Sequence, residues 1–251
     1  MASKQWTTIS FMERSETYPN ALIILNTPLA HDQLFRQIWA AASVRYCADG
    51  GANRLYDRFE DEATFLPDLI KGDLDSLKPH VRAYYESKNV PVIHDPDQDS
   101  TDLGKCIAAL VEEEKRLGQG KGKEKEHQLV ISGGLSGRLD QTIHTMHALM
   151  QLSEVRERTW AVGSESIACV LGKGNHDLTI SLQHFGGTCG ILPVGERAFV
   201  KTKGLKWDLG PDAYPTSVAE GVSSSNHLPQ EDISVETDVP IVWTVEVRGA
   251  E

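Results

Sequence analysis

The sequence has few cysteines, no long apolar run and no common phosphate-binding loop. Its four cysteines, Cys47, Cys106, Cys169 and Cys189, form no CxxC pair, which excludes a zinc ribbon or a dithiol redox motif. We therefore expect them to be reduced core residues. No apolar stretch approaches the ~20 residues of a membrane span, and the N-terminus has no apolar segment followed by a cleavage site. These absences predict a cytoplasmic protein without a membrane partner.

Positive charge is also scarce. The 251 residues include 36 acidic and 25 basic side chains, for a net charge of -11, which opposes binding to nucleic acid phosphates or to an anionic membrane. We expect no nucleic acid partner, and a polyanionic ligand would need a metal or a local basic patch. The hydrophobic fraction of 40% is that of an ordinary globular protein.

Several familiar motifs are missing. There is no Walker A loop, no GxGxxG fingerprint, no GxSxG elbow and no HExxH, so we expect His144 and His147 to be ordinary helix residues. The run 95–106 starts like a calcium loop, but Ser100 and Cys106 occupy the positions of its glycine and glutamate. The glycine- and charge-rich segment 117–127 is interpreted as a solvated loop.

The first part of the chain alternates short apolar runs with helical patterns, which is typical of a doubly wound, mainly parallel α/β sheet. The expected strands are 21–26, 44–49, 68–73, 90–95 and 128–134. The expected helices are 31–42, 79–88, 101–116 and 140–155, with Ser100 or Thr101 capping the third. Ligands of such sheets bind outside the carboxyl ends of the strands.

After residue 160 the pattern changes to short β-like pieces separated by turns. The pieces are 167–171, 177–182, 188–194, 205–209, 232–237 and 241–247. We therefore predict an α/β domain over 1–158 followed by an all-β sandwich over 159–251.

Aspartates gather at the predicted strand ends. The positions are Asp49, Asp73, Asp75, Asp95, Asp97, Asp99, Asp102 and Asp140. Aspartates in loops usually cap helices and stabilise turns. However, like charges on one sheet edge repel unless a cation compensates. If 73–75 is extended, Asp73 and Asp75 point the same way and can converge on one hard cation such as Mg²⁺.

Two glycine pairs stand at other predicted strand ends, Gly50-Gly51 and Gly133-Gly134. Glycine lets backbone N–H groups approach phosphate oxygens at a helix start, although such pairs usually serve turns. Arg138 stands between Gly137 and Asp140, where its guanidinium could bridge a phosphate and a carboxylate.

Taken together, these motifs resemble eukaryotic thiamine pyrophosphokinases. The matching pieces are ILNTPL (24–29), CADGGANRLYD (47–57), LPDLIKGDLDS (66–76), DPDQDSTDLGKC (95–106), GGLSGRLDQ (133–141), GLKWDL (204–209), VSSSN (222–226) and VETDVPIVWT (235–244). They cover nearly the whole chain in order. The resemblance implies an α/β domain, a β-sandwich, and a homodimer with active sites at the subunit interface.

The resemblance also implies roles for individual residues. Asp73, Asp75 and Asp102 would hold Mg²⁺ and the phosphates of ATP, and Asp49, Asp99 and Asp140 would lie close by. The set expected at the nucleotide is Asp49, Gly50, Gly51, Gly133, Gly134, Arg138 and Gln141, and the set expected at thiamine is Gln98, Trp207, Ser223, Ser225 and Asn226. Trp207 could equally be a core aromatic, because 204–209 also has the pattern of a half-buried strand.

The resulting hypothesis is transfer of pyrophosphate from ATP to the hydroxyl of thiamine, with Asp73, Asp75, Asp99, Asp102 and Asp140 as catalytic residues. Asp99 or Asp140 could accept the hydroxyl proton. Two alternatives remain open at this stage. A metal-dependent hydrolase would form AMP without thiamine, and a non-catalytic thiamine sensor would leave ATP intact.

Overall fold

The computed structural model describes residues 3–60, 62, 64–118, 126–156 and 158–249. Its contacts divide the chain into two units, Phe11–Gly137 on the one hand, and Met1–Ser10 together with Arg138–Glu251 on the other. The domain boundary expected at residue 158 follows the change in sequence pattern, and it stays a prediction. Each unit is described separately below.

The unit Phe11–Gly137 contains a parallel sheet in the order β6-β2-β3-β4-β5. Its strands are β2 (Asn20–Ile24), β3 (Ala42–Ala48), β4 (Leu69–Gly72), β5 (Val92–His94) and β6 (Gln128–Ser132). Every residue of β2 and β6 is buried, as expected for a sheet covered on both faces. The parallel α/β sheet predicted from the sequence is confirmed.

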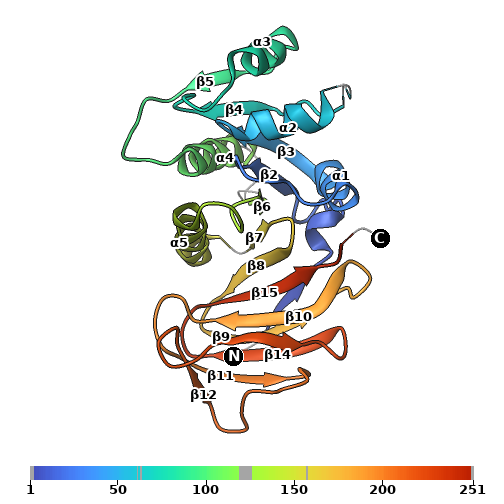
Figure 1. Cartoon of the computed structure of the whole chain (residues 1–251), viewed down its shortest axis with the longest axis vertical. Coiled ribbons are helices and arrows are strands. Elements are labelled where there is room, and N and C mark those ends of the chain that lie inside the picture. Colours follow the sequence, from blue (N-terminus) through green and yellow to red (C-terminus); the bar gives the residue numbers. More distant parts are fainter. Residues whose placement is uncertain (1–2, 61, 63, 119–125, 157, 250–251) are drawn as a thin grey trace. The chain divides into compact units, whose positions relative to one another are not determined.

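Helices cover this sheet. They are α1 (Asp32–Ala41), α2 (Gly51–Phe59), α3 (Pro79–Ser87) and α4 (Asp102–Gly118), after a short 3-10 turn η1 (Ser10–Met12). Strands β2 to β5 succeed one another in one direction and the next connection returns to β6, so right-handed crossovers place α4 opposite to α1. Figure 1 shows α1 and α4 on opposite sides of β2. The sequence pattern did not predict α2.

The first turn of α4 is capped as predicted. Thr101 Oγ1 accepts a hydrogen bond from the backbone N–H of Gly104 at 3.2 Å, which satisfies one of the N–H groups that a helix start leaves unpaired. The cap fixes the place of Asp102, the first residue of the helix.

The far end of α4 is joined to the start of β6. Glu114 and His127 are both buried, and Glu114 Oε1 accepts the backbone N–H of His127 at 2.8 Å and lies 3.1 Å from His127 Nδ1. Most of the loop expected at 117–127 lies outside the described residues, since 119–125 are not described.

The second unit contains α5 (Leu139–Val155) and two sheets. One has the order β13-β10-β15-β8-β7 and the other β1-β9-β14-β11-β12. Their strands are β1 (Lys4–Thr7), β7 (Thr159–Val162), β8 (Ser166–Leu171), β9 (Gly174–Thr179), β10 (Phe185–Leu192), β11 (Ala198–Lys203), β12 (Tyr214–Thr216), β13 (Ser223–His227), β14 (Asp232–Thr237) and β15 (Ile241–Val247). Trp6 of β1 meets Trp160 of β7 edge to face, with ring centroids 5.6 Å apart. The predicted β-rich second half is confirmed, with β1 as an addition from the N-terminus.

One predicted strand is wrong. Residues 205–209 form a turn after β11, and hydrogen bonds from preceding residues to the carboxylate of Asp208 stabilise it. This carboxylate accepts hydrogen bonds from the Thr202 hydroxyl at 3.0 Å, from the backbone N–H of Gly204 at 3.2 Å and from that of Leu205 at 3.0 Å.

All four cysteines are buried and unbridged, which confirms that they are core residues. Burial raises the pKa of the Cys106 thiol to about 12, so it stays protonated at neutral pH.

Among the described residues, no helix is both long and apolar enough to cross a membrane.

Candidate active site

Three carboxylates meet at the carboxyl edge of the parallel sheet. Asp49 directly follows β3, Asp73 directly follows β4, and Asp102 begins α4 after the loop that leaves β5. One oxygen of each lies within 4.8 Å of the others. Strand ends of a parallel sheet share one edge, so residues distant in sequence converge there. We call Asp49, Asp73 and Asp102 the acidic group.

Backbone contacts hold the acidic group in place. Asp102 Oδ1 accepts the N–H of Asp73 at 3.2 Å, and Asp49 Oδ2 accepts the N–H of Ser76 at 3.1 Å. A Cβ atom at Gly72 would lie 2.7 Å from Asp49 Cβ and 2.8 Å from Asp102 Oδ1. Any side chain at Gly72 would therefore push the acidic group apart.

The charges of the acidic group are close and partly buried. Two carboxylates 4.8 Å apart repel by ~3.5 kcal/mol at an effective dielectric constant of 20. Burial, together with the neighbouring charge of Asp102, raises the pKa of Asp49. Asp49 Oδ1 is buried and has no hydrogen-bond partner among the described residues. The three carboxylates, which include this unsatisfied buried oxygen, form a donor set that a hard divalent cation such as Mg²⁺ would fit.

A lysine beneath the acidic group was missed by the sequence reasoning. Lys105 is buried on α4, and its Nζ lies 3.4 Å from Asp102 Oδ1. Its position three residues after Asp102 on a predicted helix was the available signal, because residues i and i+3 share a helix face.

Asp75 lies in a different environment from the one expected. The condition that 73–75 is extended is not met, because Leu74 has a φ of 62° and the chain turns at this point. Asp73 Oδ1 accepts the backbone N–H of Asp75 at 3.2 Å, and Asp75 Oδ1 accepts the Ser76 hydroxyl at 2.8 Å. A metal-binding role for Asp75 stays a prediction.

The segment after β5 is shaped by its own aspartates. Asp95 Oδ1 accepts the N–H of Asp97 at 3.3 Å, and Asp97 Oδ1 accepts that of Asp99 at 2.9 Å. Asp95 also pairs with Lys71 at 3.2 Å, and the Asp97 N–H together with Lys71 lowers its pKa. Asp95 and Asp97 thus stabilise turns, whereas the side chains of Gln98 and Asp99 lie exposed on the same loop.

The glycine pairs have clear packing roles. Gly50 precedes α2 and Gly51 begins it, and a Cβ at Gly51 would lie 2.1 Å from the carbonyl oxygen of Ile24. Gly133 and Gly134 have φ values of 102° and 77°, a region that favours glycine. The N–H of Gly134 donates to Thr27 Oγ1 at 2.9 Å. Contact with a nucleotide stays a prediction for all four.

In the second unit, Arg138 and Asp140 form an exposed bidentate pair. Arg138 Nη2 lies 2.5 Å from Asp140 Oδ2, and Nε lies 3.1 Å from Oδ1. Hydrogen bonding to Arg138 lowers the pKa of Asp140. The N–H of Gln141 donates to Asp140 Oδ1 at 3.0 Å, so these three predicted residues form one group at the start of α5.

Asn226 forms hydrogen bonds with two of the other residues expected at thiamine, Trp207 and Ser223. Its Nδ2 donates to the carbonyl oxygen of Trp207 at 2.8 Å and to Ser223 Oγ at 3.2 Å, and its Oδ1 accepts the N–H of Trp207 at 3.3 Å. Asn226 is buried, whereas the Trp207 side chain is 55% exposed, so Trp207 is not a core aromatic. Lys206 Nζ lies 4.6 Å from its ring centroid. Ser225 is exposed and lies next to Asn226 on β13.

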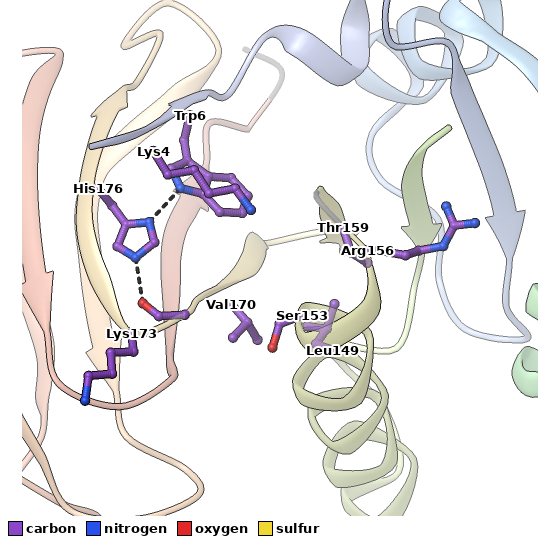
Figure 2. A pocket seen from close by; sticks show the side chains of 10 residues that line it. Lys4, Trp6, Leu149, Ser153, Arg156, Thr159, Val170, Lys173 and His176 are labelled. Carbon is purple, nitrogen blue, oxygen red and sulfur yellow. Dashed lines mark hydrogen bonds between the residues drawn. The ribbon is translucent and has the colours of Figure 1, made fainter. Parts of the chain in front are cut away.

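A separate cavity of about 190 Å³ lies within the second unit (Figure 2), and no predicted site residue lines it. His176 Nδ1 accepts the indole N–H of Trp6 at 3.0 Å, and Nε2 donates to the carbonyl of Gly172 at 2.6 Å. Figure 2 shows the side chains of Lys173 and Arg156 extending away from the His176 ring. We interpret this region as a structural link between β1 and β9.

Comparison with known proteins finds two matching family models, one after the other along the chain. Residues 35–161 match the family described as "Thiamin pyrophosphokinase, catalytic domain", and residues 175–242 match "Thiamin pyrophosphokinase, vitamin B1 binding domain". The first match contains the acidic group, and the second contains Trp207 and Asn226.

Individual relatives extend the match over most of the chain. Thiamine pyrophosphokinase of Saccharomyces cerevisiae is 33% identical over 93% of this chain and 87% of its own, and thiamine pyrophosphokinase 2 of Arabidopsis thaliana is 34% identical over 91% and 86%. The solved structure of thiamin pyrophosphokinase from Candida albicans superposes with a TM-score of 0.85 at 25% identity, covering 98% of this chain and 93% of that one. The chain therefore belongs to the thiamine pyrophosphokinase family of enzymes.

Proposed function

We propose that this chain transfers the pyrophosphate group of ATP to the hydroxyl of thiamine, giving thiamine diphosphate and AMP. Membership of the family supports the reaction. The observation that carries the proposal to individual residues is the acidic group, whose three carboxylates lie within 4.8 Å of one another at the edge where such sheets bind ligands.

The acidic group would hold Mg²⁺, with Asp73 and Asp102 as ligands, Asp75 as a further ligand from the adjoining turn, and Asp49 beside them. When bound, the ion would neutralise charge on the phosphates. The protein's own contribution is positioning. The hydrogen bond from Asp73 N–H to Asp102 holds that carboxylate before any ligand binds, and the lack of a side chain at Gly72 leaves room for Asp49 and Asp102.

The exposed face of Trp207 suits thiamine, whose thiazolium ring is a permanent cation that an indole can hold by cation-π attraction. The ring already holds one cation, since Lys206 Nζ lies 4.6 Å from its centroid. The side chain of Asn226 bonds both the backbone N–H and the backbone carbonyl of Trp207, and so holds the residue that carries the indole. Gln98, Ser223 and Ser225 would supply the remaining polar contacts to thiamine.

The hydroxyl proton needs an acceptor, and Asp99 and Asp140 are the two candidates. Pairing with Arg138 lowers the pKa of Asp140, which opposes its uptake of a proton. Asp99 is exposed and has no ion pair in the described part of the chain, so we favour Asp99. The guanidinium N–H groups of Arg138 that do not bond to Asp140 could bind phosphate oxygens.

We also propose that the protein is a homodimer and that it is located in the cytoplasm. The residues proposed to lie near the nucleotide are Gly50, Gly51, Gly133, Gly134 and Gln141. Size-exclusion chromatography with light scattering would measure the oligomeric state. A monomer that is fully active would refute the dimer.

The reaction is tested by incubating the purified protein with ATP, Mg²⁺ and thiamine, and separating the products by chromatography. Equal amounts of thiamine diphosphate and AMP, absent when thiamine or Mg²⁺ is omitted, are the expected result. AMP formed without thiamine would instead indicate a hydrolase. Binding of thiamine without any turnover would indicate a sensor.

A further inference from the structure

Lys105 is a buried cation attached to the acidic group. Its side chain is 3% exposed, and Nζ lies 3.4 Å from Asp102 Oδ1. Lysine is almost never buried to this extent unless it is paired. Because the side chain is enclosed, the ammonium group has little access to solvent.

Asp102 Oδ1 accepts from two donors, Lys105 Nζ at 3.4 Å and the N–H of Asp73 at 3.2 Å. These contacts fix one oxygen of Asp102 from within the protein. They also place one positive charge against Asp102, which is one of the three carboxylates of the acidic group. If all three carboxylates are ionised, the lysine reduces their net charge from three negative charges to two.

A fixed ammonium group beside a cation site repels an incoming divalent ion. The phosphates of a nucleotide add negative charge and offset that repulsion. We propose that Lys105 is a positioning residue that holds Asp102 and weakens divalent-cation binding to the nucleotide-free protein, so that the cation binds mainly together with nucleotide. This inference rests on the proposed function, because it assigns the acidic group to the cation.

The test is Mn²⁺ binding to the nucleotide-free protein, followed by electron paramagnetic resonance of the free ion. Lys105→Met keeps the length and burial of the side chain but removes its charge, and it should lower the Kd for Mn²⁺ by about tenfold or more. Lys105→Arg keeps the charge and should leave Kd within about twofold of wild type. Lys78→Met is the control, because Lys78 pairs with Asp57 at 3.0 Å and neither residue belongs to the acidic group.

Unchanged or weaker Mn²⁺ binding by Lys105→Met would overturn the inference. Circular dichroism checks that each variant is folded, and Lys105→Gln replaces Lys105→Met if the latter is not. A non-hydrolysable ATP analogue should tighten Mn²⁺ binding more in wild type than in the neutral variant, and an equal effect would also contradict the inference. If Mn²⁺ binding by the wild type and the variants follows these expectations but the wild type makes no thiamine diphosphate, the proposed reaction is refuted and the inference about Lys105 stands.

Discussion

The backbone N–H of Asp73 donates to the carboxylate of Asp102 across 3.2 Å, although the two residues are 29 positions apart in the chain. The bond joins the end of β4 to the start of α4. It means that the geometry of the acidic group is set largely by backbone. Substitutions that keep the shape of these side chains but change their charge should therefore affect chemistry more than folding.

Asp73→Asn and Asp102→Asn should each slow turnover on the order of 10²-fold or more, because each removes one charge that stabilises the transferred group through its cation. Steady-state formation of thiamine diphosphate at limiting Mg²⁺ measures the effect. Asp57→Asn is the control, since Asp57 of α2 forms an exposed ion pair with Lys78, which directly precedes α3. Near-normal turnover in both site variants would remove these residues from the catalytic assignment.

Trp207→Ala should raise the KM for thiamine by roughly 2- to 30-fold, the range that corresponds to the usual strength of a cation-π contact. The KM for ATP and kcat should change little. Trp207→Phe should retain part of the affinity. Phe199→Ala, which removes another exposed aromatic side chain from the same unit, should leave the KM for thiamine unchanged, and a matching rise in that control would contradict a specific role for the indole.

Asn226→Ala should lower the free energy of unfolding by about 1–3 kcal/mol, because it leaves the backbone groups of Trp207 and His227 without their partner. Urea denaturation measures this loss. Asn175→Ala, at an exposed position on β9, serves as the control. Equal urea midpoints for Asn226→Ala and wild type would show that these hydrogen bonds are not stabilising.

Stability should decrease in mild acid through His176. Burial is the main cause that lowers its pKa below the usual 6.5, so the unfolded chain binds a proton more readily than the folded one. The contribution to stability is therefore complete above pH 6.5 and is lost as pH falls toward the folded pKa. Protonation also removes the acceptor for the Trp6 indole N–H. Urea unfolding at pH 7.5 and 5.5 should show a smaller pH effect in His176→Gln than in wild type, and parallel pH dependences would refute this role.

The α/β half of the fold followed closely from the sequence, because buried parallel strands are continuous apolar runs and α4 has a regular helical pattern with a Thr101 cap. The helix α2 did not, since its residues are mostly polar and glycine begins it. The turn at 205–209 was also missed. Its apolar alternation suggested a strand, whereas the three hydrogen bonds to Asp208 decide its shape.

For the site, the sequence indicated which carboxylates share the sheet edge, because their positions after strands are visible in the chain. It could not indicate how they face one another. The positive φ of Leu74 gives Asp75 an environment different from that of Asp73, and a single backbone dihedral leaves no clear pattern in a sequence. The burial of Lys105 was equally hidden, since lysine is usually a surface residue.

The contact between Glu114 and His127 has a practical use. Glu114 of α4 accepts the backbone N–H of His127, directly before β6, at 2.8 Å. This hydrogen bond joins α4 to β6 through two residues that lie outside 119–125. The entropy of closing a longer loop rises only slowly with its length. A short epitope tag or a fluorophore-labelled peptide inserted after Gly118 should therefore leave the folded enzyme intact, and would provide a labelling position away from the carboxyl edge of the sheet.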